Sequence, residues 1–539
     1  MLGRMMKLPL TIASLIRHAD RWHGDTEIVS RLVEGGIQRY DWREAHQRSR
    51  MLANALRALG VRPGERVATL AWNTFRHLEI YFAVSGSGSV CHTVNPRLFP
   101  DQIAWIMGDA EDQYVFFDLT FLKLVESIAP RVPGVKGWVA MTDRAHMPQS
   151  ALPLLCYEEL VAAQDDHFEW PELDEDSASS LCYTSGTTGN PKGALYSHRS
   201  TVLHSFAVCM PDAFGLSASE VVLPVVPMFH VNAWGIPYAA PMAGAKLVLP
   251  GPNLDGASLL ELFDNEKVTM TAGVPTVWLA LLQHLEKNGT TPETLARVVI
   301  GGAAAPPAMI KAFREKHAIE VLHAWGMTEL SPLGTLNHFK AKHGAWNEAD
   351  RDLLREKQGR PLYGIDLRIV GADGPQPHDG VSFGDLQCRG HWVIDRYFRD
   401  AGGEVLTDGW FATGDVSTID ADGYMKITDR SKDVIKSGGE WISSIDIEGL
   451  AMAHSAVAEA AVIGVKHPKW DERPILVVVR KPGQEVDAKA LLGFLEGKVA
   501  KWWMPDDVVF VDALPHTATG KLSKLELRKQ LAGYRLPGT

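Results

Sequence analysis

A short loop rich in glycine and hydroxyl side chains constrains the fold of this chain more than any other feature of its sequence. The loop runs from Tyr183 to Gly193 and reads Tyr-Thr-Ser-Gly-Thr-Thr-Gly-Asn-Pro-Lys-Gly, with an apolar run before it and another after it. Glycines let several backbone N–H groups converge on one anion, and Ser and Thr hydroxyls add adaptable donors. Lys192 adds a positive charge. The loop therefore predicts a polyphosphate-binding turn that directly follows a buried strand.

Two other interpretations of this loop are less well supported. A surface hairpin would explain the turn residues, but not why hydroxyls, glycines and a lysine occur together directly after an apolar strand. A Walker A loop requires Gly, four residues and then Gly-Lys-Ser/Thr. Here Pro191 stands where the second glycine should follow Gly186, and Gly193 comes after Lys192. The P-loop NTPase fold is therefore disfavoured.

Apolar residues on both sides of the loop alternate between helical and strand-like spacing. Residues 43–59 predict a helix that stops at Gly60, and residues 66–71 predict a short strand. The same alternation predicts helices over 256–267 and 274–287 and strands over 268–272 and 297–300. This pattern is typical of an α/β domain with mostly buried parallel strands.

The character of the sequence changes after about residue 360. Short strands, including residues 367–370 and 385–389, are separated by Gly, Asp and Pro turns, which predicts a β-rich subdomain. The charged residues 429–433 then precede a compact final segment. Its pattern predicts a small α+β domain with a helix over 447–453, strands over 457–465 and 474–480, a helix over 487–501 and a strand over 508–511. Since 539 residues exceed what one core supports, we place a domain boundary near residue 432.

Composition excludes several classes of partner. The net charge is −11 and no dense run of Lys and Arg occurs, which argues against nucleic acid. The five cysteines form no CxxC pair, so neither a zinc site nor a disulfide framework is expected. No segment approaches the ~20 apolar residues of a membrane span, and no clear leader precedes the chain. We expect a cytoplasmic protein without stable membrane insertion.

Four later segments and the loop itself resemble, in order, the motifs of the ANL superfamily of adenylating enzymes. This superfamily includes acyl-CoA synthetases, nonribosomal-peptide adenylation domains and luciferases. The segments are His-Ala-Trp-Gly-Met-Thr-Glu at 323–329, Phe-Ala-Thr-Gly-Asp at 411–415, residues 429–443, and Pro-His-Thr-Ala-Thr-Gly-Lys at 515–521. The resemblance implies an AMP-forming acyl-CoA ligase that uses ATP, Mg²⁺ and coenzyme A. It also implies a large N-terminal domain over 1–431, with two α/β subdomains and a β-rich one, and a small mobile α+β domain over 432–539.

The resemblance also assigns roles to individual residues. Thr328 contacts the AMP phosphate, Asp415 and Arg430 bind the ribose, and Lys521 catalyses adenylation. Thr184 and Glu329 hold Mg²⁺, which prefers oxygen ligands. The catalytic set is Lys521, His230, Thr184 and Glu329. The set for ATP and coenzyme A is Thr184, Ser185, Gly186, Thr187, Thr188, Gly189, Lys192, Gly302, Ala303, Ala304, His323, Ala324, Trp325, Gly326, Met327, Thr328, Asp415, Arg430, Lys432, Lys436, Gly438, Gly439, Glu440, Trp441 and Lys521.

The segments 226–235 and 301–306 resemble the lining of an acyl tunnel in this superfamily. His230 would lie near the adenylate carbonyl and Trp234 would gate the tunnel. The expected substrate set is His230, Trp234, Gly235, Gly302, Gly326 and Met327. Plain core packing is the alternative for the Trp, Met and His residues. Trp325 departs from the superfamily, which often has Tyr there, so the nucleotide pocket would have a different shape.

The acid itself is less constrained by the sequence. Residues 1–6 and 195–199 resemble 3-methylmercaptopropionyl-CoA ligases, whereas 223–234 and 438–444 resemble homodimeric long-chain fatty-acyl-CoA ligases. We therefore expect a fatty acid or a 3-methylmercaptopropionate-like acid, and a homodimer. One methylene changes binding by only about 1–3 kcal/mol, so pocket composition does not give the chain length.

Three competing functions share parts of this pattern. A nonribosomal-peptide adenylation domain would carry an acidic residue after Phe229, where His230 stands. A luciferase-type oxygenase would share the adenylation step. An inactive scaffold is disfavoured because Lys192, Glu329 and Lys521 are all present. A stand-alone adenylating enzyme that passes the acyl group to an amine or a carrier protein remains the alternative.

Overall fold

The computed structural model describes residues 1, 3–184, 190–437, 440–517 and 521–536. The predicted site residues Ser185, Gly186, Thr187, Thr188, Gly189, Gly438 and Gly439 lie outside the described residues, as do the side chains of Glu440 and Trp441.

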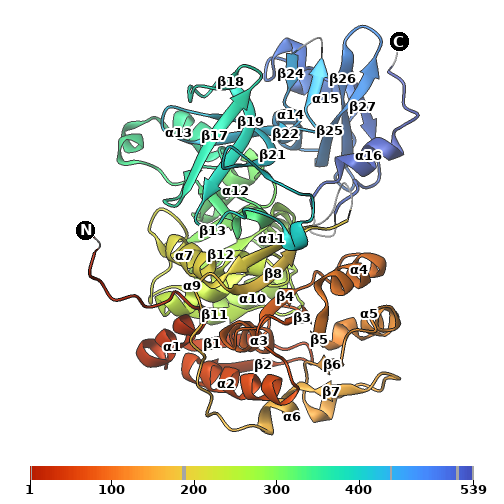
Figure 1. Ribbon diagram of the computed structural model, residues 1–539. Coiled ribbons are helices and arrows are strands. Elements are labelled where there is room, and N and C mark those ends of the chain that lie inside the picture. The colour runs from red at the N-terminus through yellow and green to blue at the C-terminus, as the bar shows by residue number, and fades with distance from the viewer. Residues whose placement is uncertain (2, 185–189, 438–439, 518–520, 537–539) are drawn as a thin grey trace.

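A seven-stranded sheet forms one half of the α/β body (Figure 1). Its strand order is β7-β6-β5-β3-β4-β8-β9, and all neighbouring strands are parallel except β8 and β9. The strands are β3 (Arg66–Leu70), β4 (Val90–Thr93), β5 (Asp112–Phe117), β6 (Gly137–Ala140), β7 (Leu154–Cys156), β8 (Ala178–Tyr183) and β9 (Gly193–Ser197).

A nine-stranded sheet forms the other half. Its order is β16-β15-β14-β13-β12-β10-β11-β1-β2, parallel from β14 to β1 and antiparallel at both edges. The strands are β1 (Glu27–Arg31), β2 (Ile37–Asp41), β10 (Val221–Pro224), β11 (Lys246–Leu249), β12 (Met270–Gly273), β13 (Arg297–Ile300), β14 (Glu320–Gly326), β15 (Leu333–Leu336) and β16 (Arg360–Pro361).

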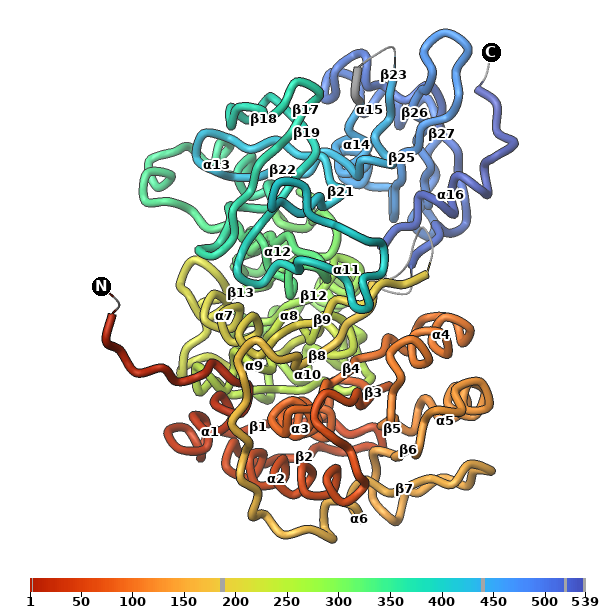
Figure 2. Tube along the Cα trace, viewed as in Figure 1, coloured from red at the N-terminus to blue at the C-terminus, as the bar shows by residue number. Residues whose placement is uncertain are grey.

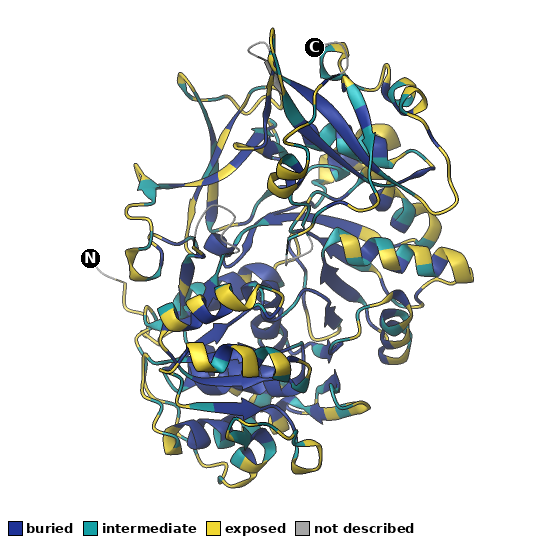
Figure 3. Cartoon of the chain, turned by 90° about the vertical axis from the view of Figure 1, so that its right-hand side faces the viewer, coloured by how far each residue is buried: buried dark blue, intermediate teal, exposed yellow. Residues whose placement is uncertain are grey.

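Helices cover both faces of each sheet, which is why the strands read as continuous apolar runs. One buried cluster joins the two sheets through α1 (Ile12–His23), α2 (Trp42–Ala58), α3 (Phe75–Gly86), α7 (His198–Cys209) and α9 (Ile236–Ala243). The outer faces carry α4 (Pro100–Ala110) and α5 (Leu122–Ile128) on one sheet, and α10 (Gly256–Glu266), α11 (Pro275–Asn288) and α12 (Pro307–His317) on the other. Shorter helices are α6 (Tyr157–Ala162), α8 (Val231–Trp234) and α13 (Glu348–Arg355). Figure 3 shows the buried strands between helices whose outer faces are exposed.

A smaller antiparallel sheet of six strands follows the α/β body along the chain. Its order is β18-β17-β19-β21-β20, with β22 paired to β21. The strands are β17 (Ile365–Gly371), β18 (Gly374–Pro375), β19 (Phe383–Gly390), β20 (Leu406–Thr407), β21 (Trp410–Ile419) and β22 (Met425–Arg430).

The last segment forms a five-stranded sheet with its own buried clusters on both faces. It comprises β23 (Ile435–Ser437), β24 (Glu440–Ile442), β25 (Val457–His467), β26 (Asp471–Arg480) and β27 (Asp507–Phe510), with α14 (Ser444–Met452), α15 (Ala488–Leu495) and α16 (Lys524–Gln530). Figures 1 and 2 show this sheet beside the six-stranded sheet at the upper end of the molecule. The predicted domain boundary falls in the connection from Arg430 to Ile435.

The predicted fold class is confirmed: a large α/β part with a β-rich sheet, followed by a small α+β part. Gly60 follows the end of α2 with φ +80°, as its predicted role as a helix stop requires. The predicted helix over 487–501 is wrong beyond Leu495. There Glu496 leaves the helical region with φ −59° and ψ 129°, and Gly497 has φ +77°, so the helix ends and a 3₁₀ turn at Lys501–Trp503 follows. Among the described residues, no helix is both long and apolar enough to cross a membrane.

Candidate active site

Hydrogen bonds between Thr184 and Lys192 close the base of the predicted phosphate loop. Thr184 follows β8 and its N–H donates to the carbonyl of Lys192, 2.9 Å away. The N–H of Lys192 in turn donates to Oγ1 of Thr184 at 3.1 Å. Because β8 and β9 are paired antiparallel on either side, these two bonds hold the base of the loop as a tight hairpin.

Tyr397 connects Glu329 to Lys192 at the base of this loop. The Tyr397 hydroxyl donates to Oε1 of Glu329 at 2.6 Å, and the ammonium group of Lys192 lies 5.0 Å from the centre of the Tyr397 ring. A second tie comes from β9, where the Tyr196 hydroxyl donates to the carbonyl of Thr328 at 2.6 Å. Both Thr328 and Glu329 are buried. The structure therefore brings together the predicted phosphate lysine and the predicted metal carboxylate.

Asp415 on β21 is held by two charged or polar donors. Trp325 at the end of β14 donates its indole N–H to Oδ2 at 2.8 Å, and Arg430 at the end of β22 pairs with Oδ1 at 2.9 Å. Burial raises the pKa of Asp415, and Arg430 and Trp325 oppose that rise. Trp325 fits because Gly334 has no side chain: a β-carbon there would lie 2.4 Å from the indole ring.

Lys521 lies close to both the Asp415 pair and an apolar cavity. Burial lowers the pKa of its ammonium group to about 8; Arg430 adds to this, while Asp415 and Glu329 act against it. Its Cε would lie 3.6 Å from a β-carbon at Gly302, whose φ of +78° favours glycine. The predicted catalytic lysine is therefore placed among the predicted ribose and metal residues.

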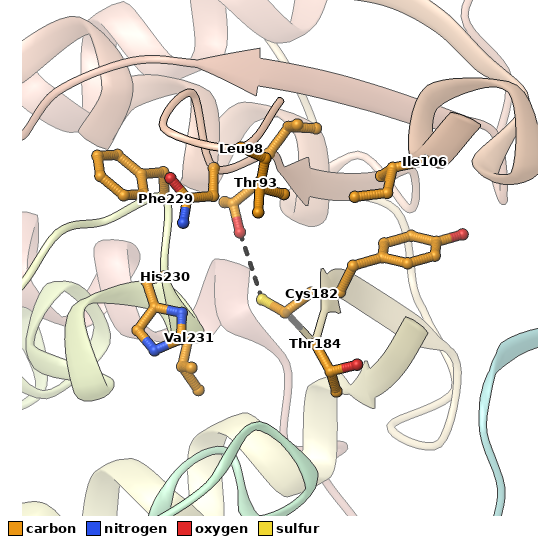
Figure 4. Close-up of a pocket in the computed structure, with 11 residues that line it drawn as sticks. Thr93, Leu98, Ile106, Cys182, Thr184, Phe229, His230 and Val231 are labelled. Atoms are coloured by element: carbon orange, nitrogen blue, oxygen red, sulfur yellow. Dashed lines mark hydrogen bonds between the residues drawn. The ribbon is translucent and has the colours of Figure 1, made fainter. Parts of the chain in front are cut away.

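The cavity beside Lys521 has mostly apolar walls. It is lined by Arg97, Val225, Val226, Pro227, Phe229, His230, Trp234, Leu254, Val274, Val277, Gly302 and Lys521. A second cavity shares Phe229 and His230 and reaches Thr184 (Figure 4). His230 thus lines both cavities. Burial, with the charges of Lys521 and Arg97, lowers its pKa to about 3, so the imidazole is neutral at pH 7.

The turn that carries His230 and Trp234 has an unusual backbone. Val231, Asn232, Ala233 and Trp234 all have φ between +46° and +55°, a left-handed conformation that costs about 1–2 kcal/mol per residue. Buried polar contacts compensate for this strain. The Asn232 amide donates to Ser180 at 3.1 Å, and its oxygen accepts from Tyr81 at 3.3 Å. Strain held by surrounding contacts is common at binding sites.

Other predicted residues lie at varying distances from this centre. His323 is buried with both ring nitrogens engaged, Nδ1 by the carbonyl of Glu356 at 2.9 Å and Nε2 by the N–H of Ala305 at 3.2 Å. Its ring therefore orients the chain around residue 305. Lys432 is exposed on the connection to the C-terminal sheet, and Lys436 is exposed on β23 of that sheet. Gly235, Ala303, Ala304, Ala324, Gly326 and Met327 lie in the segments that carry Trp234, Gly302, Trp325 and Thr328.

The sequence matches the profile of the AMP-binding enzyme family over residues 15–398 and that of the AMP-binding enzyme C-terminal domain over residues 446–521. The chain belongs to the AMP-binding enzyme family. The predicted ANL superfamily membership is therefore confirmed.

Curated relatives in this family match nearly the whole chain. The 3-methylmercaptopropionyl-CoA ligase of Ruegeria lacuscaerulensis is 57% identical over 532 residues, covering 98% of this chain and 99% of the relative. The medium-chain-fatty-acid–CoA ligase of Ectopseudomonas oleovorans is 52% identical, and the long-chain-fatty-acid–CoA ligase of Thermus thermophilus is 47% identical; each match covers 98% of this chain and 97% of the relative. The predicted enzyme class, an AMP-forming acyl-CoA ligase, is confirmed, and this class implies ATP and coenzyme A.

The fold is shared with solved structures of the family. The anthranilate CoA ligase AuaEII in complex with anthranoyl-AMP is similar with a TM-score of 0.86 at 26% identity, covering 98% of this chain and 100% of that chain. Sequence reasoning did not single out Tyr397, Tyr196 or Arg97, although each contacts or lines the site. Two lone tyrosines and an arginine outside any motif carry no local signal, and their roles follow only from the packing.

Proposed function

We propose that this AMP-forming ligase activates an apolar short- to medium-chain acid, such as 3-methylmercaptopropionate or a medium-chain fatty acid, in the cavity beside Lys521. The observation that carries the proposal is the position of Lys521, which lines the apolar cavity while lying within the electrostatic reach of Asp415 and Glu329. A bound acid and a bound nucleotide would therefore both lie next to the ammonium group of Lys521.

In the first half-reaction, the carboxylate of the acid attacks the α-phosphorus of ATP and pyrophosphate leaves. A carboxylate is already nucleophilic, so the protein contributes position and charge neutralisation rather than a base. Lys521 and Lys192 neutralise the phosphates, and Asp415 holds the ribose. Neutral His230 lies where the acyl cavity meets the phosphate loop and orients the carboxylate.

Magnesium is part of this proposal. Glu329 and Thr184 would hold the cation through side-chain oxygens, which Mg²⁺ prefers, and Tyr397 orients one Glu329 oxygen. Bound there, Mg²⁺ would offset negative charge on the phosphates.

In the second half-reaction, the thiol of coenzyme A attacks the adenylate carbonyl and AMP leaves. Lys521 occupies space next to the carbonyl, so we propose that the C-terminal domain, residues 432–539, moves away and the segment around Lys436 and Trp441 then faces coenzyme A. Such a hinge motion allows one site to serve two steps. We also retain a homodimer and a cytoplasmic location as proposals, on the resemblance described above.

The lining of the cavity supports the class of acid. Its aliphatic and aromatic side chains come mainly from the segment after β10, the start of α11 and the left-handed turn, and among the described residues neither Asp nor Glu lines it. An α-amino group would therefore have no counter-charge, which disfavours amino acids. The acids named for the 57% and 52% identical relatives, 3-methylmercaptopropionate and medium-chain fatty acids, are apolar beyond the carboxylate.

A screen of acids from propionate to palmitate, including 3-methylmercaptopropionate, tests this proposal. We expect AMP release that requires both ATP and coenzyme A and is highest for one of the short- or medium-chain acids. Formation of AMP without coenzyme A, in the presence of an amine or a carrier protein instead, would favour the alternative acceptor. Lys521→Ala should abolish pyrophosphate–ATP exchange while sparing thioester formation from a supplied adenylate.

A further inference from the structure

Two basic residues one helical turn apart on α16 hold the connection between the six-stranded sheet and the C-terminal sheet. Lys524 lies beside Asp429, with 4.0 Å between Nζ and Oδ1, and Arg528 pairs with Asp433 at 2.6 Å. Residues at i and i+4 lie on the same face of a helix. The two carboxylates are also four residues apart, and they bracket the predicted domain boundary.

Lys524 is the more deeply buried of the two. Its side chain is 9% exposed and that of Asp429 is 2% exposed. Its ammonium group lies 2.8 Å from Glu448 of α14 and also contacts the hydroxyl of Ser444. Asp429 accepts two hydrogen bonds from Ser444, from the N–H at 3.1 Å and from the hydroxyl at 2.5 Å. A buried ammonium group is costly unless paired, and here β22 supplies part of the pairing from outside the C-terminal sheet.

Only two residues separate Lys521 from Lys524, and hydrogen bonds tie this short stretch to Pro515 and Thr517. Ser523 caps α16 and its N–H donates to the carbonyl of Pro515 at 2.8 Å. The N–H of Thr517 donates to the carbonyl of Lys521 at 2.7 Å, and the N–H of Lys521 donates to the Thr517 hydroxyl at 3.2 Å. The backbone of Lys521 is therefore fixed relative to the start of α16.

Asp429, the partner of Lys524 on β22, lies next to a residue of the expected nucleotide site. Asp429 directly precedes Arg430, whose guanidinium pairs with Asp415 at 2.9 Å. Lys524 therefore connects two stretches of backbone. One is the stretch before α16, which carries Lys521, and the other is the end of β22, where Arg430 pairs with Asp415. A shift of Lys524 against Asp429 would move Lys521 relative to the expected ribose site.

We propose that Lys524, supported by Arg528, is a positioning residue for adenylate formation: its contact with Asp429 sets where Lys521 stands relative to Asp415. This inference rests on the proposed role of Lys521. It assigns Lys524 no contact with a substrate. A purely structural salt bridge would need only Glu448, which lies with Lys524 in the C-terminal segment. Asp429, in contrast, lies on β22, and Asp433 lies on the connection that follows β22.

The test compares both half-reactions in the full-length Lys524→Met, Lys524→Arg and Arg528→Gln proteins. We expect Lys524→Met to lower kcat of pyrophosphate–ATP exchange by roughly a hundredfold, as displacement of a catalytic group by about 1 Å does, with KM for ATP changed far less. Thioester formation from a supplied adenylate should stay within about threefold of wild type, because that step does not use Lys521. Lys524→Arg should restore most of the exchange, and Arg528→Gln should lower it more weakly. Lys529→Gln on the same helix is the matched control, since Lys529 is exposed and pairs with Glu526 of α16.

Each outcome decides between the possible roles. Equal loss of both half-reactions, in step with a lower melting temperature, would assign Lys524 a structural role and overturn the inference. If Lys524→Met does not fold, the Lys524→Arg and Arg528→Gln proteins still test the inference. It would be overturned if Arg528→Gln left exchange unchanged and Lys524→Arg lowered both half-reactions equally. Should Lys521→Ala itself retain exchange, the proposed function fails. Should Lys521→Ala be inactive and Lys524→Met fully active, only the positioning role fails.

Discussion

The lowered pKa of Lys521 predicts that adenylate formation by the free enzyme declines in mildly alkaline solution. Burial places this pKa at about 8 instead of the ordinary 10.5. Above pH 8 the charged form, which we propose neutralises the α-phosphate, falls by about tenfold for each further pH unit. Because kcat/KM reports groups of the free enzyme, kcat/KM for ATP in pyrophosphate exchange should bend downward near pH 8.

The bound nucleotide changes the expected position of this bend. A triphosphate next to Lys521 favours the ammonium form, so kcat, which reports the bound state, should stay level to a higher pH than kcat/KM. Lys521→Arg provides the control, because guanidinium keeps its charge throughout this range. Its exchange activity, though lower, should show no bend near pH 8. A wild-type profile that runs parallel to the arginine variant up to pH 10 would refute the assignment.

The same pKa has a consequence for stability with a definite sign. In the unfolded chain Lys521 titrates near 10.5, whereas in the folded protein it titrates near 8, so the unfolded state binds the proton more tightly. Its charge therefore destabilises the fold at pH 7, by at most about 3 kcal/mol, and this penalty disappears as the pH rises from 8 towards 10.5. Lys521→Met should melt higher than wild type at pH 7, and the difference should vanish near pH 10.5.

Three further changes follow from single contacts at the site. Trp325→Phe removes the indole N–H that holds Asp415, and since a hydrogen bond to a charged group contributes about 1.5–3 kcal/mol, KM for ATP should rise roughly tenfold or more while the melting temperature changes little. Trp234→Ala enlarges the acyl cavity, so kcat/KM should shift towards longer acids; an unchanged preference in a competition between octanoate and palmitate would contradict the cavity assignment. Asn232→Ala should unfold at a lower temperature than Asn232→Gly, because both lose the contacts to Ser180 and Tyr81 but only glycine adopts the left-handed backbone without strain.

Local pattern was sufficient to predict most of the architecture. The predicted helix over 43–59 is α2 (Trp42–Ala58), and the predicted strand over 297–300 is β13 (Arg297–Ile300). These elements are specified by their own apolar spacing and by stop residues such as Gly60. The helix over 487–501 failed past Leu495 because the apolar spacing continued while the backbone turned at Gly497, and periodicity alone does not register that turn.

Motif residues were also predictable, but their hydrogen-bond partners were not. Glu329, Asp415 and Lys521 stand in short motifs, so their identities were visible in the sequence. Tyr397, which orients Glu329, and Tyr196, which holds Thr328, come from other strands and loops far away along the chain. Only tertiary packing brings such residues together, of β9 against the segment after β14 for Tyr196 and of the segment after β19 against Glu329 for Tyr397, and no local spacing encodes it.

Trp325 illustrates how such a distant partner changes the interpretation of a substitution. Taken alone, an indole in place of the family's frequent tyrosine removes a hydroxyl donor and adds bulk to the nucleotide pocket. In the folded protein the indole N–H replaces the lost donor by bonding Asp415, and the absent side chain at Gly334 on β15 provides the space for the larger ring. The two positions therefore depend on each other: a β-carbon at Gly334 would press on the indole and move its N–H away from Asp415. Any residue that restores bulk at position 334 should weaken ribose binding unless Trp325 is made smaller as well, since the compensation is steric and lies across the β14–β15 pair.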